Sequence, residues 1–269
     1  MLPSLLSRKD ARDYQIIFLL LFLGLGIYTR DWSIDPLKSL VILTSCLFTQ
    51  ALMAKGTGLK SALITALGLI LLLRSDNYVV LGLAGSVAIA SKFLFQAEGK
   101  HWFNPANFGI VCALLGSGQA WVSPGQWGQE GLYALLFLCL GGMILRKVGR
   151  WDTTASFLLV YVGLEAVRNF WLGWEIDVLS HQLLNGSLLL FAFFMITDPR
   201  SIPNARQGRI LWAVAIACVT FLLRNWFFIS SAPFYALFLV SPFTVLIDRA
   251  QPAPRFHWVK KPVPLWSLS

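Results

Sequence analysis

Long apolar runs, separated by short polar loops, recur from Tyr14 to Ile247. Several approach the ~20 residues that an α-helix needs to cross a bilayer. The chain is 57% hydrophobic and only 13% charged, whereas a soluble domain carries roughly 25% charged residues. These features exclude an ordinary soluble protein. They predict an all-α polytopic membrane protein whose main partner is the lipid bilayer.

The apolar runs divide into about ten predicted spans, two of which are short. The third and fifth are short, and two alternatives are open for them: tilted helices, or broken helices that line a cavity. The ranges are 14–29, 36–54, 59–73, 78–97, 105–118, 130–147, 153–172, 179–197, 207–224 and 231–248.

Positive charge predicts the orientation. With a cytoplasmic N-terminus and ten spans, 17 of the 22 Lys and Arg residues fall on the cytoplasmic side, as multi-pass proteins of the inner or plasma membrane require. We therefore expect a cytoplasmic N-terminus (1–13), one transmembrane domain (14–248) and a cytoplasmic tail (249–269), in which Trp258 and Trp266 could anchor at the membrane surface. The net charge of +9 then reflects topology, and no nucleic-acid partner is expected.

Three further features of the sequence concern processing, metal binding and catalysis. Arg8, Lys9 and Arg12 precede the first apolar run as in a signal peptide, but no small-residue cleavage site follows, so an uncleaved first span is expected. The four cysteines lie inside apolar runs without a CxxC or Cys/His pair, which predicts free thiols and no metal site. The chain has no GxSxG, Walker or GxGxxG motif, so an ATP-driven pump within it is not expected. Whether it is part of an enzyme stays open.

The densest polar stretch between two apolar runs is GKHWFNPANFG, residues 99–109. Pro105 suits the first position of a helix and Asn104 suits its N-cap, which is a purely structural interpretation. Lys100, His101 and Asn107 are left unexplained by it. A helix N-terminus with these added donors could hold an anionic or carbonyl-rich ligand.

A second loop, ITDPRSIPNARQGR, repeats the plan of the first further along the chain. Asp198 either caps a turn within a positively charged loop or forms part of a ring or phosphate site shared with the first loop. The similarity of the two loops suggests an internal duplication of the chain. Paired segments that are interrupted by Pro or Gly indicate a transporter-type binding site. Both loops fall on the cytoplasmic side of the predicted topology.

Polar residues inside the spans are further candidates, because ionisable groups in a membrane are costly. Lys92 either extends to the interface or takes part in the site. Glu165 could pair with Arg168, three residues on. His181 and Asn185 are four residues apart, so we expect them to share a helix face. Candidates for an ion or substrate pathway are Glu165, Asp248, His181 and Asn185, although Asp248 also fits a simple boundary charge.

Four stretches between about residues 40 and 250 resemble a known family. They are SKFLFQAEGKHWFNPANFG, RWDTTASFLLVY, NGSLLLFAFFMITDPRSIPNARQGR and SPFTVLIDR. They resemble the RnfD/NqrB family, whose members are membrane subunits of the Rnf electron-transport complex and of the sodium-translocating NADH:quinone oxidoreductase. The resemblance implies two five-helix halves, about 14–118 and 130–248, with a urea-transporter-like arrangement. It also implies a non-covalent flavin, FMN or riboflavin, near Asn104 and Asn107.

One departure from the family concerns the covalent flavin. Family members attach FMN to a Thr in the outer loop between the fifth and sixth spans, but residues 117–131 contain no Thr, so covalent FMN is not expected there. Thr153 and Thr154 look like an attachment motif but align with the start of the seventh span, on the other side of the membrane. The chain resembles a shortened, stand-alone member of the family.

Three possible functions follow from these observations. The first is a flavin-binding electron-transfer subunit that works with other membrane redox or transport subunits. The second is a channel-like transporter of a small metabolite, flavin or ion without redox activity, and the third is a structural membrane partner. The candidate cofactor-binding residues are Asn104, Asn107, Lys100, His101, Asp198 and Lys92.

Overall fold

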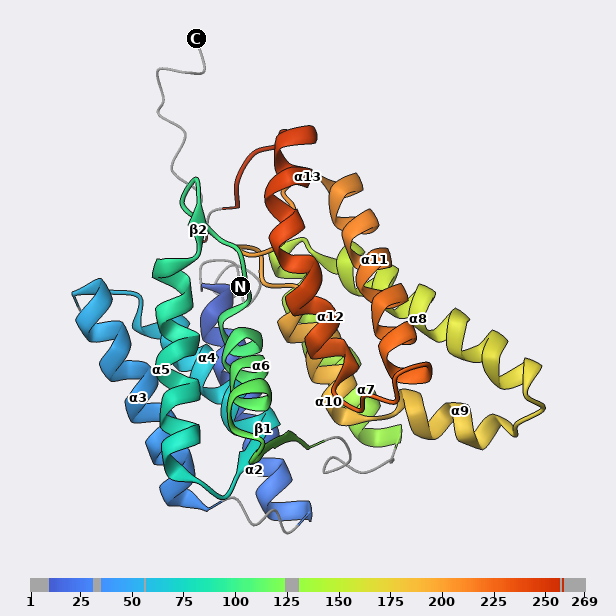
Figure 1. Ribbon diagram of the computed structural model, residues 1–269, viewed down its shortest axis with the longest axis horizontal. Helices are drawn as coiled ribbons and strands as arrows, with labels where there is room; N and C mark the ends of the chain where they lie inside the picture. The colour runs from blue at the N-terminus through green and yellow to red at the C-terminus, as the bar shows by residue number, and fades with distance from the viewer. Residues whose placement is uncertain (1–9, 31–34, 56, 124–130, 257, 259–269) are drawn as a thin grey trace, which may run out of the picture.

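The computed structural model describes residues 10–30, 35–55, 57–123, 131–256 and 258. Parts of three predicted regions lie outside these ranges: the N-terminal residues 1–9, the outer loop at 124–130, and the tail at 257 and 259–269, which includes Trp266. The described chain is a bundle of helices with two very short sheets (Figure 1).

The helices follow the apolar runs of the sequence. They are α2 (Ala11–Arg30), α3 (Pro36–Ala54), α4 (Leu59–Leu72), α5 (Tyr78–Leu94), α6 (Pro105–Ser117), α7 (Gly131–Val148), α8 (Trp151–Trp171), α9 (Ile176–Leu183), α10 (Gly186–Leu190), α11 (Arg206–Asn225), α12 (Ala232–Val240) and α13 (Thr244–Ala250). A π-helical turn, Phe191–Met195, continues α10, and a 3-10 turn, Ser241–Phe243, joins α12 to α13. Each of the ten predicted ranges therefore coincides with a helical segment.

The predicted eighth span, 179–197, is wrong as a single helix. The side chain of Asn185 accepts a hydrogen bond from the Ser187 amide at 2.9 Å and starts a new helix. As a result, α9 and the α10 segment meet at an angle of 51°. An Asn prefers this capping role to the interior of a helix because its side chain competes for backbone hydrogen bonds.

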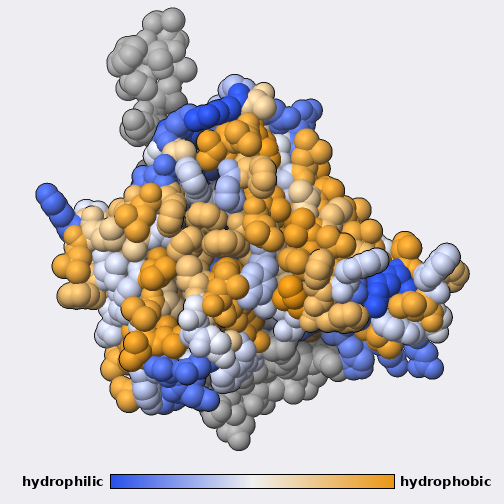
Figure 2. All heavy atoms as spheres, viewed as in Figure 1, coloured by the Kyte–Doolittle hydropathy of each residue, from blue (hydrophilic) through white to orange (hydrophobic). Residues whose placement is uncertain are grey.

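The protein is a multi-pass membrane protein. Within the described residues, four helices are long and apolar enough to cross a bilayer, and the bent α9–α10 pair gives a fifth. Large apolar side chains are exposed on these and neighbouring helices, including Leu83, Leu211 and Leu239. Figure 2 shows the corresponding hydrophobic band across the middle of the molecule, with hydrophilic residues gathered toward its ends.

The two short predicted spans become short helices that end in paired strands. α4 and α6 have 14 and 13 residues, or about 20 Å of helix, against a hydrocarbon core of about 30 Å. Strand β1 (Leu73–Ser75) follows α4 and pairs antiparallel with β4 (Ala120–Val122), which follows α6. This pairing satisfies backbone groups that leave the helix. The second sheet is a hairpin of β2 (Gln96–Ala97) and β3 (Lys100–His101).

Helix packing follows the same plan twice. α5 packs between α3 and α6, and α2 packs on α4; α11 packs between α8 and α12, and α7 packs on α10 and its π-helical turn. This plan makes the loop at 226–231 the counterpart of the loop at 95–104. The two loops that resemble each other in sequence are therefore not equivalent positions of a repeat. They meet in space instead.

Close packing of α5 on α6 depends on Gly109. A Cβ atom there would lie 2.6 Å from the Ala84 carbonyl oxygen and 2.8 Å from the Ala88 Cβ. We expect Gly109→Ala to destabilise the protein by about 1–3 kcal/mol because the helices must separate. The matched control is Gly163→Ala on α8, where the new Cβ meets nothing within 4 Å. Thermal unfolding in detergent checks this, and equal melting temperatures for the two variants would contradict it.

Candidate functional site

The loops at 95–104 and 196–205 lie side by side at one end of the bundle. Asn104 donates from Nδ2 to the Met195 carbonyl at 3.1 Å. The Arg200 guanidinium donates to the Gly99 carbonyl at 3.2 Å. The two polar loops picked out in the sequence thus form one structure.

Asn104 has the predicted N-cap role. Its Oδ1 accepts from the Asn107 amide at 3.1 Å, and Pro105 occupies the first turn of α6. Because Nδ2 is bonded to Met195, both polar atoms of the side chain are used within the protein. Asn104 lines the cavity described below, but its bonds hold the two loops together.

Asn107 does not lie at the predicted cofactor position. It is fully buried, and its Nδ2 donates to the Phe234 carbonyl of α12 at 3.1 Å. It is not one of the cavity-lining residues. Asn107 therefore joins α6 to α12, and the expectation of direct ligand contact is corrected. The reason is that its side chain points along the helix contact and not toward the helix N-terminus.

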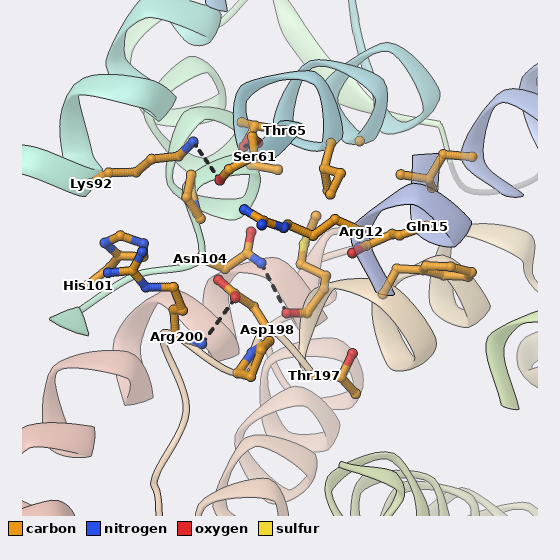
Figure 3. Close-up of a pocket in the computed structure, with 18 of the residues that line it drawn as sticks. Arg12, Gln15, Ser61, Thr65, Lys92, His101, Asn104, Thr197, Asp198 and Arg200 are labelled. Carbon is orange, nitrogen blue, oxygen red and sulfur yellow. Dashed lines mark hydrogen bonds between the residues drawn. The ribbon is translucent and has the colours of Figure 1, made fainter. Parts of the chain in front are cut away.

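A cavity of about 300 Å³ opens beneath the paired loops. Figure 3 shows polar side chains that enter it from different parts of the chain. Its apolar wall comes largely from α4, α7 and the π-helical turn, with Leu71, Ile144 and Phe193 among the contributors. Its polar lining comprises Arg12, Gln15, Gln50, Thr57, Ser61, Thr65, Lys92, Gln96, His101, Asn104, Thr197, Asp198 and Arg200.

Lys92 is the most deeply placed cation of this cavity. It is only 4% exposed, so it does not extend to the membrane interface. Its Nζ donates to Ser61 Oγ at 3.1 Å, and no ion pair joins it to a carboxylate among the residues that the structure describes. A buried ammonium with a neutral partner is costly. Such a group is suited to an incoming anionic or carbonyl oxygen.

Asp198 and Arg200 lie across the cavity from Lys92 (Figure 3). The Arg200 amide donates to Asp198 Oδ1 at 3.2 Å, so Asp198 has the predicted turn-capping role. Both residues line the cavity as well. The structural and the functional interpretations of Asp198 are therefore compatible.

His101 lies between two cavities. It lines the one described above and a second of about 320 Å³ near β3 and α13. The ring is buried and its Nδ1 has no hydrogen-bond partner within the described structure. Burial lowers the pKa of His101 to about 4; Asp198 opposes this shift, while Arg200 and Lys92 add to it. The imidazole is therefore neutral at physiological pH.

The lowered pKa of His101 predicts a pH dependence of stability. The unfolded chain takes up this proton near pH 6.5 but the folded chain only near pH 4. Stability is therefore full above about pH 6.5 and falls as the pH drops toward 4. At pH 5 the loss is about 2 kcal/mol. Unfolding at pH 5 and pH 8 measures it, and His101→Gln should remove this part of the difference; an unchanged difference in that variant would contradict the assignment.

Lys100 and Asp248 form an ion pair with each other. Lys100 Nζ lies 2.5 Å from Asp248 Oδ2, and the Asn204 amide donates to Asp248 Oδ1 at 2.7 Å. Burial lowers the pKa of Lys100, and Asp248 partly offsets this. Both residues line the second cavity and not the first. Lys100 thus joins the hairpin to α13 and does not reach the predicted ligand position.

A second ion pair, between α8 and α11, holds the loop at 196–205 in place. Arg209 of α11 and Asp152 of α8 approach to 2.5 Å, both with side chains about 95% buried (6% and 5% exposed). Arg209 also donates to the Asn204 carbonyl at 2.6 Å. Thr153 and Thr154 beside it are buried, and Thr154 donates to the Ala192 carbonyl at 2.6 Å. They pack in the bundle and present no exposed hydroxyl.

The other pathway candidates lie apart from the cavity. Glu165 is 1% exposed and accepts from Asn225 Nδ2 at 2.8 Å. The predicted pair with Arg168 is wrong: Arg168 lies over the Trp174 ring at 4.7 Å, and the described residues show no ion pair between the two. Tertiary partners outcompete the neighbour on the same helix.

His181 and Asn185 do not share a helix face, contrary to expectation. His181 is exposed on α9, whereas Asn185 caps α10 beyond the bend. Figure 1 places α9 at the end of the molecule opposite β2. Neither residue lines either cavity.

Several cavity residues are not predictable from the sequence. In the sequence, Gln50 is only a polar residue within a predicted span. Arg12 is one of the positive charges that set the membrane orientation, and Trp258 is a predicted anchor at the membrane surface. Nothing in the sequence distinguishes Arg12 from Arg8 or Lys9. Their roles depend on the way that α2, α3 and Trp258 come together around the cavity.

Comparison with known proteins identifies relatives. Residues 117–256 match the NQR2, RnfD, RnfE family. The chain is 32% identical over 150 residues to the D subunit of the ion-translocating oxidoreductase complex of Stutzerimonas stutzeri, and the match covers 53% of the chain and 39% of the relative. It is 30% identical over 158 residues to the protein of that name from Halorhodospira halophila, covering 58% and 40%. The corresponding protein of Vibrio cholerae is 34% identical over 113 residues, covering 40% and 32%.

Proposed function

Because the chain belongs to the NQR2, RnfD, RnfE family, we propose that it is a flavin-binding membrane subunit that transfers electrons within an ion-translocating oxidoreductase assembly. The relatives are named as D subunits of such complexes. The chain spans about two fifths or less of the length of these relatives, so its activity and its partner subunits are part of the proposal.

The observation that carries the proposal is the cavity beneath the paired loops. Its volume of about 300 Å³ is at the lower end of the range for small-molecule sites, and it combines an apolar wall with convergent polar groups as such sites do. Gln50 Oε1 and His101 Nδ1 are buried there without a partner in the described structure. A flavin ring has an apolar body and an edge of alternating donors and acceptors, which fits this lining.

Named side chains have distinct roles in this proposal. Gln50 and His101 would hydrogen-bond the polar edge of the ring. Arg12, Lys92 and Arg200 would hold its carbonyl oxygens or a phosphate, because charge-assisted bonds are the strong ones. Leu71 and Phe193 would exclude water. The bound flavin would supply one- and two-electron transfer, and the buried positive charge of Lys92 would favour a ligand that gains negative charge.

The finer topology belongs to the same proposal. We propose ten membrane crossings in two five-helix halves, within one domain at 14–248, and cytoplasmic termini in the inner or plasma membrane. The repeated packing plan of α2–α6 and α7–α12 supports this, as does the gathering of Lys and Arg on one side. Reporter fusions at the C-terminus test it: activity of a reporter that works only outside the cytoplasm would contradict it.

A channel-like transporter is the second candidate, and the helix geometry favours it. The break between α9 and α10 and the short helices α4 and α6 resemble the interrupted segments of transporter sites. Uptake of a solute into vesicles that contain the purified protein but no flavin would support this alternative.

Purification of the protein from membranes in mild detergent tests the proposal. We expect the visible absorbance of oxidised flavin, released into the filtrate on denaturation because attachment is non-covalent. A colourless protein that also fails to bind added FMN or riboflavin would contradict it.

A further inference from the structure

The C-terminal residues 252–256 and 258, here called the strap, lie at the end of the bundle where the two cavities are, and Pro252, Ala253, Arg255 and Trp258 contribute to the cavity linings. Arg255 Nη2 pairs with Glu98 Oε2 at 2.8 Å, and Arg255 Nη1 donates to the Glu98 carbonyl. The guanidinium of Arg150 lies over the Phe256 ring at 5.6 Å. The strap is thus held by the β2–β3 hairpin and by the junction of α7 and α8.

The strap delivers one aromatic side chain to the cavity. Trp258 lines it, and the Arg12 guanidinium lies over the indole ring at 5.1 Å. Phe256 packs against Trp258 in an edge-to-face contact at 5.0 Å and supports its position. Arg12 is itself fixed by an ion pair with Asp10 at 2.6 Å. These contacts place Trp258 on protein, whereas the sequence suggested a membrane-surface anchor.

We propose that Trp258 covers the ring of the bound flavin and that the strap closes the cavity over it. The inference rests on the proposed function of the cavity and adds a binding residue from outside the spans. An indole is a flat, weakly polar surface, and aromatic rings in contact gain energy beyond the burial of area. Arg12, which lies over the indole, keeps it oriented.

Flavin fluorescence measures this contact directly, because stacking on an indole quenches it. We expect Trp258→Ala to raise the fluorescence of bound FMN and to speed its dissociation about 3–10-fold. The control is Trp121→Ala on β4, a half-exposed Trp in a different part of the fold, which should change neither quantity.

A charge exchange tests the strap without altering the indole. Glu98→Arg and Arg255→Glu should each speed FMN dissociation, and the double exchange should restore much of the slow rate because the pair forms again. One outcome would overturn the strap proposal alone: the unaltered protein binds FMN, and Trp258→Ala changes neither the fluorescence of the bound FMN nor its dissociation rate. Failure of the unaltered protein to bind FMN would overturn the proposed function and, with it, this inference.

Discussion

Arg209→Met should lower the free energy of unfolding by about 3–5 kcal/mol, the cost of leaving one partner of a buried ion pair alone. Arg209 bonds to Asp152 at 2.5 Å and to the Asn204 carbonyl at 2.6 Å, and the side chains of both ion-pair partners are almost fully buried. The variant leaves the Asp152 carboxylate unpaired in the bundle and frees the loop at 196–205. Thermal unfolding in detergent, followed by size exclusion, measures the loss.

Two controls separate the ion pair from the charge alone. The double variant Arg209→Met/Asp152→Leu removes both charges and should regain most of the stability, since apolar replacement of a buried pair is often neutral. Arg206→Met removes an exposed charge at the start of the same helix and should change stability by less than about 1 kcal/mol. A loss in Arg206→Met as large as that in Arg209→Met would contradict the assignment.

Lys92→Met should have opposite effects on stability and on ligand binding. Lys92 is buried with the Ser61 hydroxyl as its partner, so an apolar side chain of similar length should keep or raise the melting temperature. The same change removes a charge-assisted bond to the ligand, worth about 1.5–3 kcal/mol, and should weaken flavin binding roughly 10–100-fold. A residue kept for function at the expense of stability shows this combination.

Lys60→Met is the matched control for Lys92→Met. Lys60 lies on α4 beside Ser61, but it is half-exposed and pairs with Asp13 at 2.6 Å outside the cavity lining. It should leave flavin affinity unchanged. Equilibrium titration with FMN compares the two, and equal affinities for both variants would contradict the role of Lys92.

The helices and one cap are predictable because local chemistry determines them. The apolar runs coincide with helical segments from α2 to α13, and Asn104 caps α6 as its place before Pro105 indicates. The break at Asn185 has a signal in the sequence, the Asn-Gly dipeptide at 185–186, but the apolar residues on both sides of it favour one continuous span. The hydrogen bonds from Ser187 to Asn185 show that a new helix starts there.

The candidate site is predictable in its loops but not in its lining. The shared pattern of the two polar loops indicates that they belong together, and Lys92, His101 and Asp198 do line the cavity. Arg12 and Trp258 reach it through tertiary contacts between the two ends of the chain. Asn107 and Lys100 resemble ligand residues in sequence, yet their partners are Phe234 and Asp248. Only the packing of α12 and α13 shows this.

The central claim is that the cavity beneath the paired loops holds a flavin. A cryo-electron microscopy map of the detergent-purified protein with added FMN tests it most directly. The account predicts density for a planar ring in the cavity that Arg12, Lys92 and Arg200 line. Bound flavin found elsewhere in the protein, with this cavity empty, would contradict it.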